Sequence, residues 1–277
     1  MANHSTKPSL KTSAADRVRQ RRHERRREEI LAVAMKVMLR DGLAAMTMTS
    51  LAKGLGVAVG GLYRYFASKT HVVAALQVEA LNHLTTFNAS HFNAVERQIM
   101  ASEPGDAVKS LVRVVTAPMS YLCHAQESPD WHQLIDQSLS TPTPLLDDQS
   151  AAEVSMALEA LLQPVAERLE AATTEGHLNQ GDAEARTYIL WATIHGLDHM
   201  RKRDARLRAE LRSHALVRGA LATLLVGWGA EMTAATAAIS VVADALSTPS
   251  PGASLLPTEA PHPELASPAP SQLEPRR

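Results

Sequence analysis

Residues 47–69, TMTSLAKGLGVAVGGLYRYFASK, constrain the fold more than any other part of this chain. Apolar residues recur there at the spacing of one helix face, namely Met48, Leu51, Ala52 and Leu55. Thr47 stands just before them, where its hydroxyl can cap free N–H groups of the first turn. Gly56 follows them, and glycine is favoured where a helix ends in the left-handed conformation. We therefore predict a helix from about Met48 that ends in a sharp turn.

A second short helix is predicted for residues 59–66, directly after this turn. Val57 can fill the angle between the two helices, while Leu62 and Phe66 lie four residues apart on the buried side. Ser68 is placed to cap a third helix that follows at once. Two short helices joined by a tight turn form a helix-turn-helix, which places its second helix in the major groove of DNA. Double-stranded DNA is therefore the first partner that the sequence predicts.

The outward side chains of this segment suit contacts with phosphates and base edges. The predicted DNA-binding residues are Thr47, Thr49, Val59, Gly60, Gly61, Tyr63, Arg64, Tyr65 and Lys69. We expect replacement of Tyr63 or Lys69 to weaken binding to all sequences. Replacement of Val59 or Arg64 should instead alter which sequence is preferred.

The same segment resembles the DNA-binding domain of the tetracycline-repressor (TetR/AcrR) family. The resemblance covers residues 29–76 and is in register at Ile30, Ala34, Gly42, Thr47, Leu51, Ala52, Gly56, Val57, Gly60, Leu62, Tyr63, Phe66, Ser68 and Lys69. Two positions depart from the family pattern: Ala58 replaces a serine that commonly caps the recognition helix, and Gly61 replaces a threonine that commonly reaches a phosphate.

These departures predict a recognition helix that is loose without DNA. A missing N-cap costs about 1 kcal/mol, and each glycine costs roughly 0.8 to 1 kcal/mol relative to alanine inside a helix. Gly60 and Gly61 also leave room for the backbone to approach the groove closely. They put individual contacts in question rather than the binding role.

Charge is distributed unevenly along the chain. Residues 1–75 carry 14 Lys and Arg against 5 Asp and Glu, while residues 76–277 carry 14 against 24. The near-neutral total of −1 therefore hides a basic N-terminal part and an acidic remainder. A basic surplus at one end is the electrostatic footprint expected of a surface that binds nucleic acid.

The densest basic segment is RVRQRRHERRR at residues 17–27, which holds seven arginines. One interpretation is a flexible arm that enters a minor groove, and the other is the solvated start of a long helix. A localisation-like basic patch is a further reading that no feature demands. We expect a flexible basic leader over residues 1–20 and a DNA-binding domain over residues 21–75.

The rest of the chain predicts an all-α fold, with a helical ligand-binding and dimerisation domain over residues 76–246. An apolar ladder of Val72, Leu76, Ala80 and Leu84 extends the helix that starts at Ser68 to about Phe87. Further helices are expected near residues 105–125, 130–140, 148–175, 182–200 and 206–228. Whether a last helix reaches Leu246 stays open, and no segment shows the alternation of a strand.

Residues 247–277 hold eight prolines among Ser, Ala and Glu, a composition that predicts disorder. The single cysteine, Cys123, excludes an internal disulfide. No run of 18 apolar residues is present, so we expect no membrane span and a cytoplasmic location.

The resemblance implies that the C-terminal domain binds a small molecule and forms a homodimer through two helices near its end. Residues 182–200 and 206–228 are the candidates, because residues 215–229, ALVRGALATLLVGWG, are apolar nearly all round. The alternative is that this segment is simply the central core helix. A dimer is also needed to span half-sites ~34 Å apart, which implies a palindromic operator.

The ligand pocket has little support in the sequence. The candidate lining residues are Met119, Leu122, Cys123, Trp131, Met156, Tyr188, Trp191 and His195, with Tyr121 and Leu134 close by in the chain. Taken singly, each of them is better explained as ordinary core. His195 and His199 lie four apart, next to Asp198, and this spacing is able to hold a metal. Since no second cluster accompanies them, we predict no metal and no cofactor.

Catalytic signatures are absent from the sequence: there is no HExxH, no paired CxxC and no glycine-rich phosphate loop after a strand. We therefore predict no enzyme but a homodimeric, sequence-specific transcriptional regulator, a repressor released from a palindromic operator by a small molecule. One alternative is a helical dimer that binds a small molecule and no longer recognises a specific DNA sequence. The other is an architectural protein that binds DNA without sequence specificity.

Overall fold

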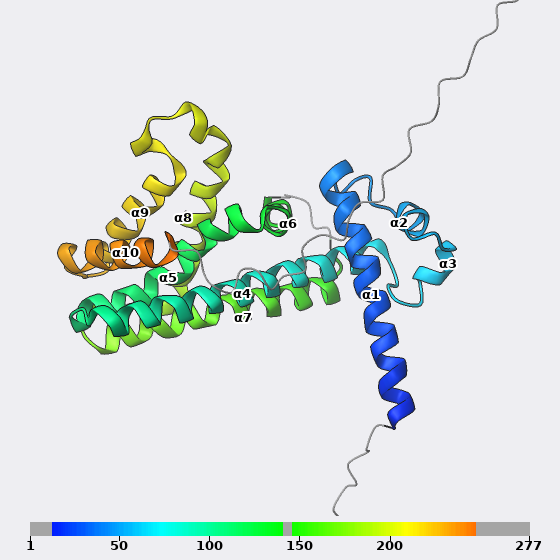
Figure 1. The fold of residues 1–277 in the computed structure, drawn as a ribbon, viewed down its shortest axis with the longest axis horizontal. Helices are drawn as coiled ribbons and strands as arrows, with labels where there is room; N and C mark the ends of the chain where they lie inside the picture. The colour runs from blue at the N-terminus through cyan, green and yellow to red at the C-terminus, as the bar shows by residue number, and fades with distance from the viewer. Residues whose placement is uncertain (1–12, 141–145, 248–277) are drawn as a thin grey trace, which may run out of the picture.

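The computed structural model describes residues 13–140 and 146–247, and within these ranges the chain forms helices and no strand. The prediction of an all-α fold is confirmed. The helices are α1 (Ala14–Asp41), α2 (Met48–Leu55), α3 (Val59–Leu62), α4 (Lys69–Ser102), α5 (Asp106–Glu127), α6 (Pro129–Ser140), α7 (Asp148–Thr174), α8 (Ala183–His199), α9 (Ser213–Gly227) and α10 (Met232–Ser247). Helices α1, α2 and α3 lie at one end of an elongated bundle, which α4 joins to them (Figure 1).

Local capping signals define α2 and the turn after it. The Thr47 hydroxyl accepts a hydrogen bond from the Ser50 N–H at 3.0 Å, and the Ser50 hydroxyl accepts one from the Thr47 N–H at 2.9 Å. Gly56 ends the helix with φ of 65°, in the left-handed region that favours glycine. The predicted start and end of this helix are both confirmed.

The second helix of the pair is shorter than predicted. We expected a helix over residues 59–66, whereas α3 ends at Leu62 and the chain continues as a turn to Tyr65. Ala58 offers no side-chain cap, and both central residues are glycines, so little local free energy favours a longer helix.

Helix α1 begins within the segment that we predicted to be a flexible leader. It starts at Ala14, where the Ser13 hydroxyl accepts a hydrogen bond from the Asp16 N–H at 3.1 Å. Our expectation of a flexible leader over residues 1–20 is therefore wrong from Ala14 onward. Of the two interpretations of the arginine run, the structure shows the start of a long helix. Residues 1–12 and 248–277, including most of the predicted disordered tail, lie outside the described residues.

Helix α4 is also longer than predicted, since it runs to Ser102 and not to about Phe87. The Ser68 hydroxyl caps its first turn by accepting from the His71 N–H at 3.3 Å. Beyond Leu84 its buried face continues through His91, Val95 and Ile99. At about 1.5 Å per residue, its 34 residues form one rod of roughly 50 Å.

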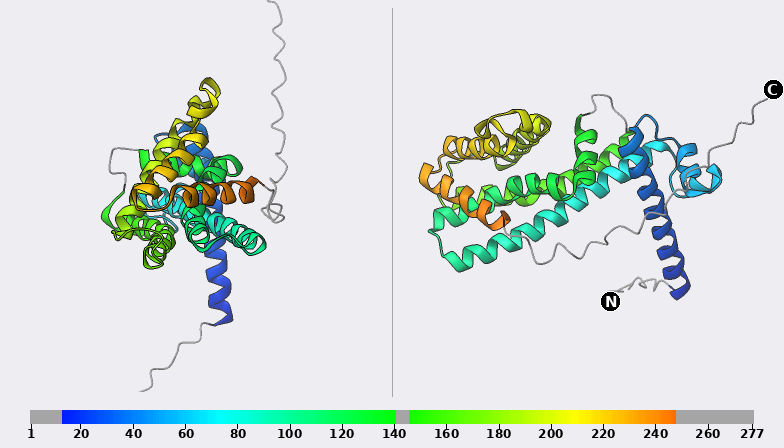
Figure 2. Two further views of the ribbon diagram at one scale, coloured as in Figure 1. Left: turned by 90° about the vertical axis from the view of Figure 1, so that its left-hand side faces the viewer. Right: turned by 45° about the horizontal axis from the view of Figure 1, so that its top comes forward.

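The C-terminal bundle packs α4, α5 and α7 together, with α10 against α5 and α8 against α7 and α9 (Figure 2). The segment predicted as one helix over residues 206–228 contains the end of a 3₁₀ segment (Met200–Arg206), a second short 3₁₀ segment (Ala209–Leu211) and then α9. The last helix, left open by the sequence, is α10. Among the described residues, no helix is long and apolar enough to cross a membrane.

Candidate nucleic-acid interface and ligand pocket

The helix-turn-helix presents a polar outer face. Tyr63 is 53% exposed, and Arg64, Thr47 and Thr49 are also exposed. The opposite face is apolar, because Leu62 and Phe66 are buried in the core as their spacing predicted. The face that remains is suited to a duplex, with a hydroxyl-bearing turn beside an aromatic and a guanidinium group.

Two of the predicted DNA-binding residues are already engaged within the chain. The ring of Tyr65 lies 4.9 Å from that of His23 on α1, and its carbonyl accepts a 2.8 Å hydrogen bond from Arg27. The Lys69 ammonium donates to the Leu43 carbonyl at 2.7 Å. Both side chains are half-buried, so each supports the shape of the helix-turn-helix.

The glycines of this segment have different environments. A Cβ added at Gly54 would lie 2.8 Å from the Val33 Cγ1, so α1 and α2 approach too closely for any side chain there. A Cβ added at Gly60 or Gly61 would meet nothing within 4 Å. Packing within the chain therefore explains Gly54 but not the two glycines of α3. Val59, between them and the turn, is half-buried against the core.

An apolar pocket lies among α4, α5, α7 and α8. It encloses about 410 Å³ of space, open solvent included, and is lined by Leu84, Asn88, Ala117, Pro118, Tyr121, Leu161, Leu162, Val165, Thr187, Leu190, Trp191 and Ile194. The buried Oδ1 of Asn88 has no hydrogen-bond partner among the described residues. An amide that faces apolar walls without a partner favours a ligand that brings a donor.

Only one of the eight predicted pocket residues, Trp191, lines this pocket. Met156 and Tyr188 point outward and are 66% and 44% exposed. Met119, Leu122 and Cys123 lie on α5 without lining it, and burial raises the pKa of the Cys123 thiol to about 11. Trp131 stacks on His83 with ring centroids 5.0 Å apart, and His195 contacts Tyr121. Residue type did not reveal which helix face points inward.

Asn88 had a signal in the sequence that we missed. It follows Leu84 by four residues, so it is the next position of the apolar ladder on which α4 was predicted. A polar residue on an otherwise apolar stripe is a candidate for ligand contact. Thr187 on α8, another polar residue that lines the pocket, had no comparable signal in the sequence.

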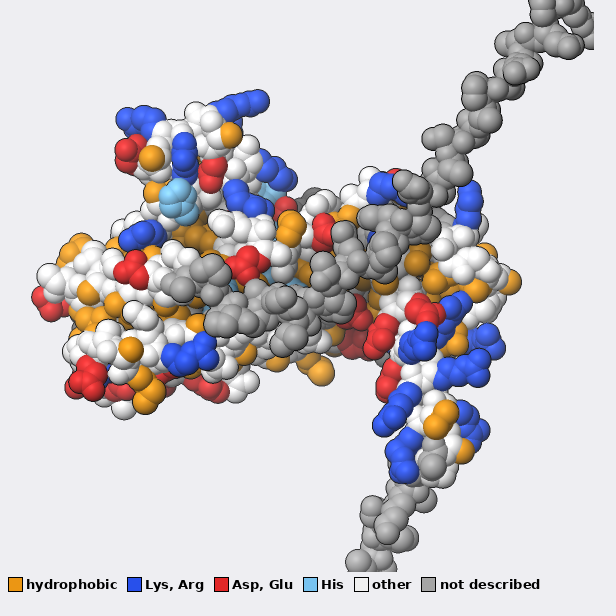
Figure 3. Space-filling model, viewed as in Figure 1, with side chains coloured by type: hydrophobic (Ala, Val, Ile, Leu, Met, Phe, Trp, Pro, Cys, Tyr) orange, Lys and Arg blue, Asp and Glu red, His pale blue; other side chains and the backbone are white. Residues whose placement is uncertain are grey.

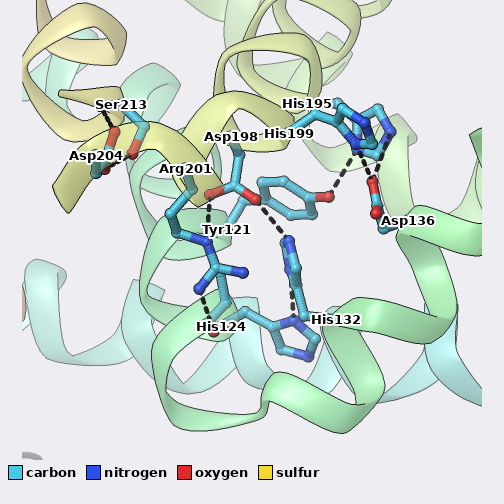
Figure 4. Close-up of polar contacts among 11 residues, drawn as sticks. Tyr121, His124, His132, Asp136, His195, Asp198, His199, Arg201, Asp204 and Ser213 are labelled. Carbon is cyan, nitrogen blue, oxygen red and sulfur yellow. Dashed lines mark hydrogen bonds and ion pairs between the residues drawn. The ribbon is translucent and has the colours of Figure 1, made fainter. Parts of the chain in front are cut away.

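A chain of three imidazoles runs from the half-buried His83 through the buried His124 and His132 to Asp198. Figure 4 shows the last three of these residues beside Tyr121, which lines the apolar pocket. His83 Nδ1 and His124 Nε2 are 3.0 Å apart, His124 Nδ1 and His132 Nδ1 are 3.4 Å apart, and His132 Nε2 and Asp198 Oδ2 are 2.7 Å apart. Every contact has a donor if His83 donates to His124, His124 to His132, and His132 to the carboxylate. Burial, with the neighbouring histidines, lowers the pKa of His124 to about 3, so its ring is neutral at pH 7.

A second polar group links the pocket to α6. The Tyr121 hydroxyl lies 2.8 Å from His195 Nδ1, and His199 Nδ1 lies 2.7 Å from Asp136 Oδ1. Burial raises the pKa of Tyr121, so its hydroxyl keeps its proton, and burial lowers the pKa of His195. Across residues 13–140 and 146–247, no three His, Cys, Asp or Glu side chains form a group that could hold a metal.

The chain resembles known proteins in the sequence of its N-terminal domain and in its fold. Residues 30–76 match the profile described as "Bacterial regulatory proteins, tetR family". Comparison with curated proteins gives no match. A putative tetR family transcription regulator from Shewanella sp. PV-4 has a similar fold, with a TM-score of 0.51, 19% identity, and coverage of 70% of this chain and 96% of that one.

Two further similar structures contain ligands. FadR from Bacillus subtilis, in complex with stearoyl-CoA, has a TM-score of 0.51 and 18% identity, and the match covers 72% of this chain and 98% of that one. AibR, in complex with isovaleryl coenzyme A and operator DNA, has a TM-score of 0.50 and 15% identity, and covers 69% and 96%. At these identities the likeness shows the fold.

The match over residues 30–76 includes the helices that form the helix-turn-helix, and over 70% of this chain the all-α fold is similar to that of a regulator of the same description. The sequence resemblance, the capped helix-turn-helix and the profile match therefore agree: residues 30–76 form a helix-turn-helix domain of the tetR family of bacterial regulatory proteins, and the chain has the fold of such regulators.

Proposed function

We propose that the protein is a homodimeric repressor that binds a palindromic operator through residues 47–69 and releases it when a small molecule enters the apolar pocket. The observation that carries this proposal is the course of α4, which begins in the DNA-binding domain and forms one wall of the pocket with Leu84 and Asn88. With a duplex as partner, the proposed location is the cytoplasm.

Helix α4 supports a mechanical coupling between the two sites. Leu84 lies 15 residues beyond Lys69, or roughly 22 Å along a straight helix. A ligand that tilts α4 at the pocket displaces the helix-turn-helix, which lies at the other end of this helix. Because the half-sites of an operator lie at a fixed spacing, a change in the separation of two such domains lowers affinity for the operator.

The pocket favours a ligand with an apolar portion and one hydrogen-bond donor. Its walls are aliphatic and aromatic apart from Asn88, Thr187 and the Tyr121 hydroxyl. Two proteins of similar fold bind stearoyl-CoA and isovaleryl coenzyme A. Acyl-CoA compounds are therefore the first class to test as effectors.

Helices α8 and α9 supply the surface that we propose for dimerisation. Tyr188 and Ile189 are large apolar side chains on α8 and are 44% and 46% exposed. Ala185, Ala192 and Gly196 continue this exposed face with small residues, which lets a second helix approach closely. A contiguous apolar strip of this kind is typical of a protein interface.

The experiment is binding of the purified full-length protein to the DNA next to its own coding region, at near-physiological salt with excess random competitor. We expect a footprint over an inverted repeat that resists the competitor. Tyr63→Ala, a change at an exposed position, should weaken it, whereas Met100→Ala, at a side chain 78% exposed on α4, should not. Binding that the competitor abolishes would favour an architectural protein instead.

The effector arm of the experiment adds stearoyl-CoA or isovaleryl-CoA to the preformed complex. Release by one of them, and loss of that response in Asn88→Leu with operator binding retained, would support the pocket. A response that Asn88→Leu leaves unchanged would place the ligand elsewhere.

A further inference from the structure

Helix α1 extends well beyond the core of the DNA-binding domain. Its buried residues begin at Ile30, and every side chain from Ala15 to Arg25 is exposed. We call residues 14–27 the arginine arm. At about 1.5 Å per residue the arm is roughly 21 Å long, and Figure 1 and Figure 3 show it projecting from the bundle with lysine and arginine colour along its length.

The arm has no apolar face. Val18, 65% exposed, is its only aliphatic side chain larger than alanine. A helix that docks on protein or lies in a membrane surface needs a stripe of apolar residues to bury. The arm lacks such a stripe, so a partner can recognise it only through charge.

The charge of the arm is strongly one-sided. It carries seven arginines against Asp16 and Glu24. Arg19 pairs with Asp16 at 2.8 Å, but Arg21 and Arg22 make no ion pair or side-chain hydrogen bond among the described residues. They are the arginines on the arm that remain available for an anion.

The spacing of the arginines adds repulsion within the helix. Arg17, Arg21 and Arg25 follow each other at four-residue intervals and so share one side of it. Like charges at this interval destabilise a helix by about 0.2 to 0.5 kcal/mol per pair. Arg17, Arg21 and Arg25 are all exposed, and a polyanion along that side would remove the repulsion.

The base of the arm is attached to the recognition segment itself. His23 packs against Tyr65 with ring centroids 4.9 Å apart. Arg27 donates to the Tyr65 carbonyl at 2.8 Å and lies over the Phe66 ring at 4.2 Å. These contacts fix the direction of the arm relative to Tyr63, which is two residues before Tyr65. A duplex bound at Tyr63 would therefore lie near the base of the arm.

We propose that the arginine arm is a second DNA-binding element, a helix that holds phosphates of the duplex flanking the half-site. It acts as a preformed helix and not as a flexible chain threaded into the minor groove. This inference rests on the duplex partner of the proposed function but not on its sequence preference, because phosphate contacts carry no sequence information.

The test compares salt dependence of binding by the full-length protein and by Arg21→Gln/Arg22→Gln, on the operator fragment and on a random duplex of equal length. Each phosphate contact contributes about −0.9 to the slope of log K against log salt. Loss of two contacts per protomer should make the slope shallower by about 1.8 for each bound protomer, or about 3.6 for the proposed dimer, on both duplexes. Glutamine and arginine have similar helix propensities, so the arm should stay helical.

Two controls separate charge at the arm from charge in general. Arg203→Gln/Arg208→Gln removes two exposed arginines from the far end of the molecule and should leave the slope unchanged. Arg21→Lys/Arg22→Lys keeps both charges and should restore it. Hydroxyl-radical footprinting should show that only the glutamine variant of the arm loses protection outside the inverted repeat.

An unchanged slope and footprint in Arg21→Gln/Arg22→Gln would overturn the inference, whatever the operator preference. A shallower slope on both duplexes would support it even if the wild-type protein did not prefer the operator. In that second case the inference about the arginine arm is supported, and the proposal of sequence-specific regulation is contradicted.

Discussion

Three glycines in the helix-turn-helix should respond in opposite directions to the same substitution. Gly60 and Gly61 have no positive φ and no heavy atom within 4 Å of an added Cβ. Alanine there should stabilise α3 by about 0.5 to 1 kcal/mol each, because glycine loses more backbone entropy on folding. The structure offers nothing to offset this gain.

Gly54→Ala should instead destabilise the domain. The helix gains the same 0.5 to 1 kcal/mol or so, but the new Cβ would lie 2.8 Å from the Val33 Cγ1. Valine is stiff at χ1, and overpacking of this kind costs about 1 to 3 kcal/mol. The net expectation is a loss of up to roughly 2.5 kcal/mol.

Hydrogen exchange of the α2 and α3 amides in the full-length protein is the assay, because it reports local opening free energies. Slower exchange in Gly60→Ala and Gly61→Ala, with faster exchange in Gly54→Ala, is the expected result. Equal effects of Gly54→Ala and Gly60→Ala would refute the reasoning from packing. We also expect Gly60→Ala to bind the operator more weakly although it is more stable. Tighter binding would show that the glycine serves only to loosen α3.

Four further changes test other parts of the structure. Arg27→Gln removes a charged hydrogen bond to Tyr65 and a ring contact, and should cost about 2 kcal/mol in denaturant unfolding as well as operator affinity. Asp198→Ala breaks a buried pair and should cost about 3 kcal/mol in the same measurement. Because the pKa of His124 is lowered to about 3 in the folded state, the unfolded chain binds more protons below about pH 6.5; stability should fall as pH drops from there toward 3, and less steeply in His124→Gln. Asn88→Leu removes an unpartnered buried oxygen and should raise the melting temperature of the ligand-free protein.

The parts of the fold that could be predicted from the sequence are those with local signals. Thr47, Gly56 and Ser68 are caps whose role depends on neighbours within four residues, and each was placed correctly. The end of α4 lacked such a signal. Its apolar ladder is interrupted after Leu84, where Asn88 is polar and the next large buried residue is His91, so the periodicity stopped before the helix did.

The ligand pocket was less predictable because it depends on which face of each helix is covered. Met156 and Tyr188 are of the right chemical type for a pocket, but the packing of α7 and α8 turns both outward. Trp191 does line the apolar pocket, and it lies three residues beyond Tyr188 on the same helix. When a helix is apolar on most sides, its sequence pattern does not show which of two residues three positions apart faces a pocket.

The chain of imidazoles could not be read from the sequence, because its members are 41, 8 and 66 residues apart. It joins α4, α5, α6 and α8, and each ring must donate in the same direction for every contact to be satisfied. Loss of any one contact leaves a buried polar group unpaired, which costs about 1 to 3 kcal/mol. Since α6 also packs against α1, this polar chain and α4 are two separate connections between the pocket helices and the DNA-binding domain. We expect a ligand that displaces Tyr121, whose ring lies 4.7 Å from that of His132, to disturb the polar chain.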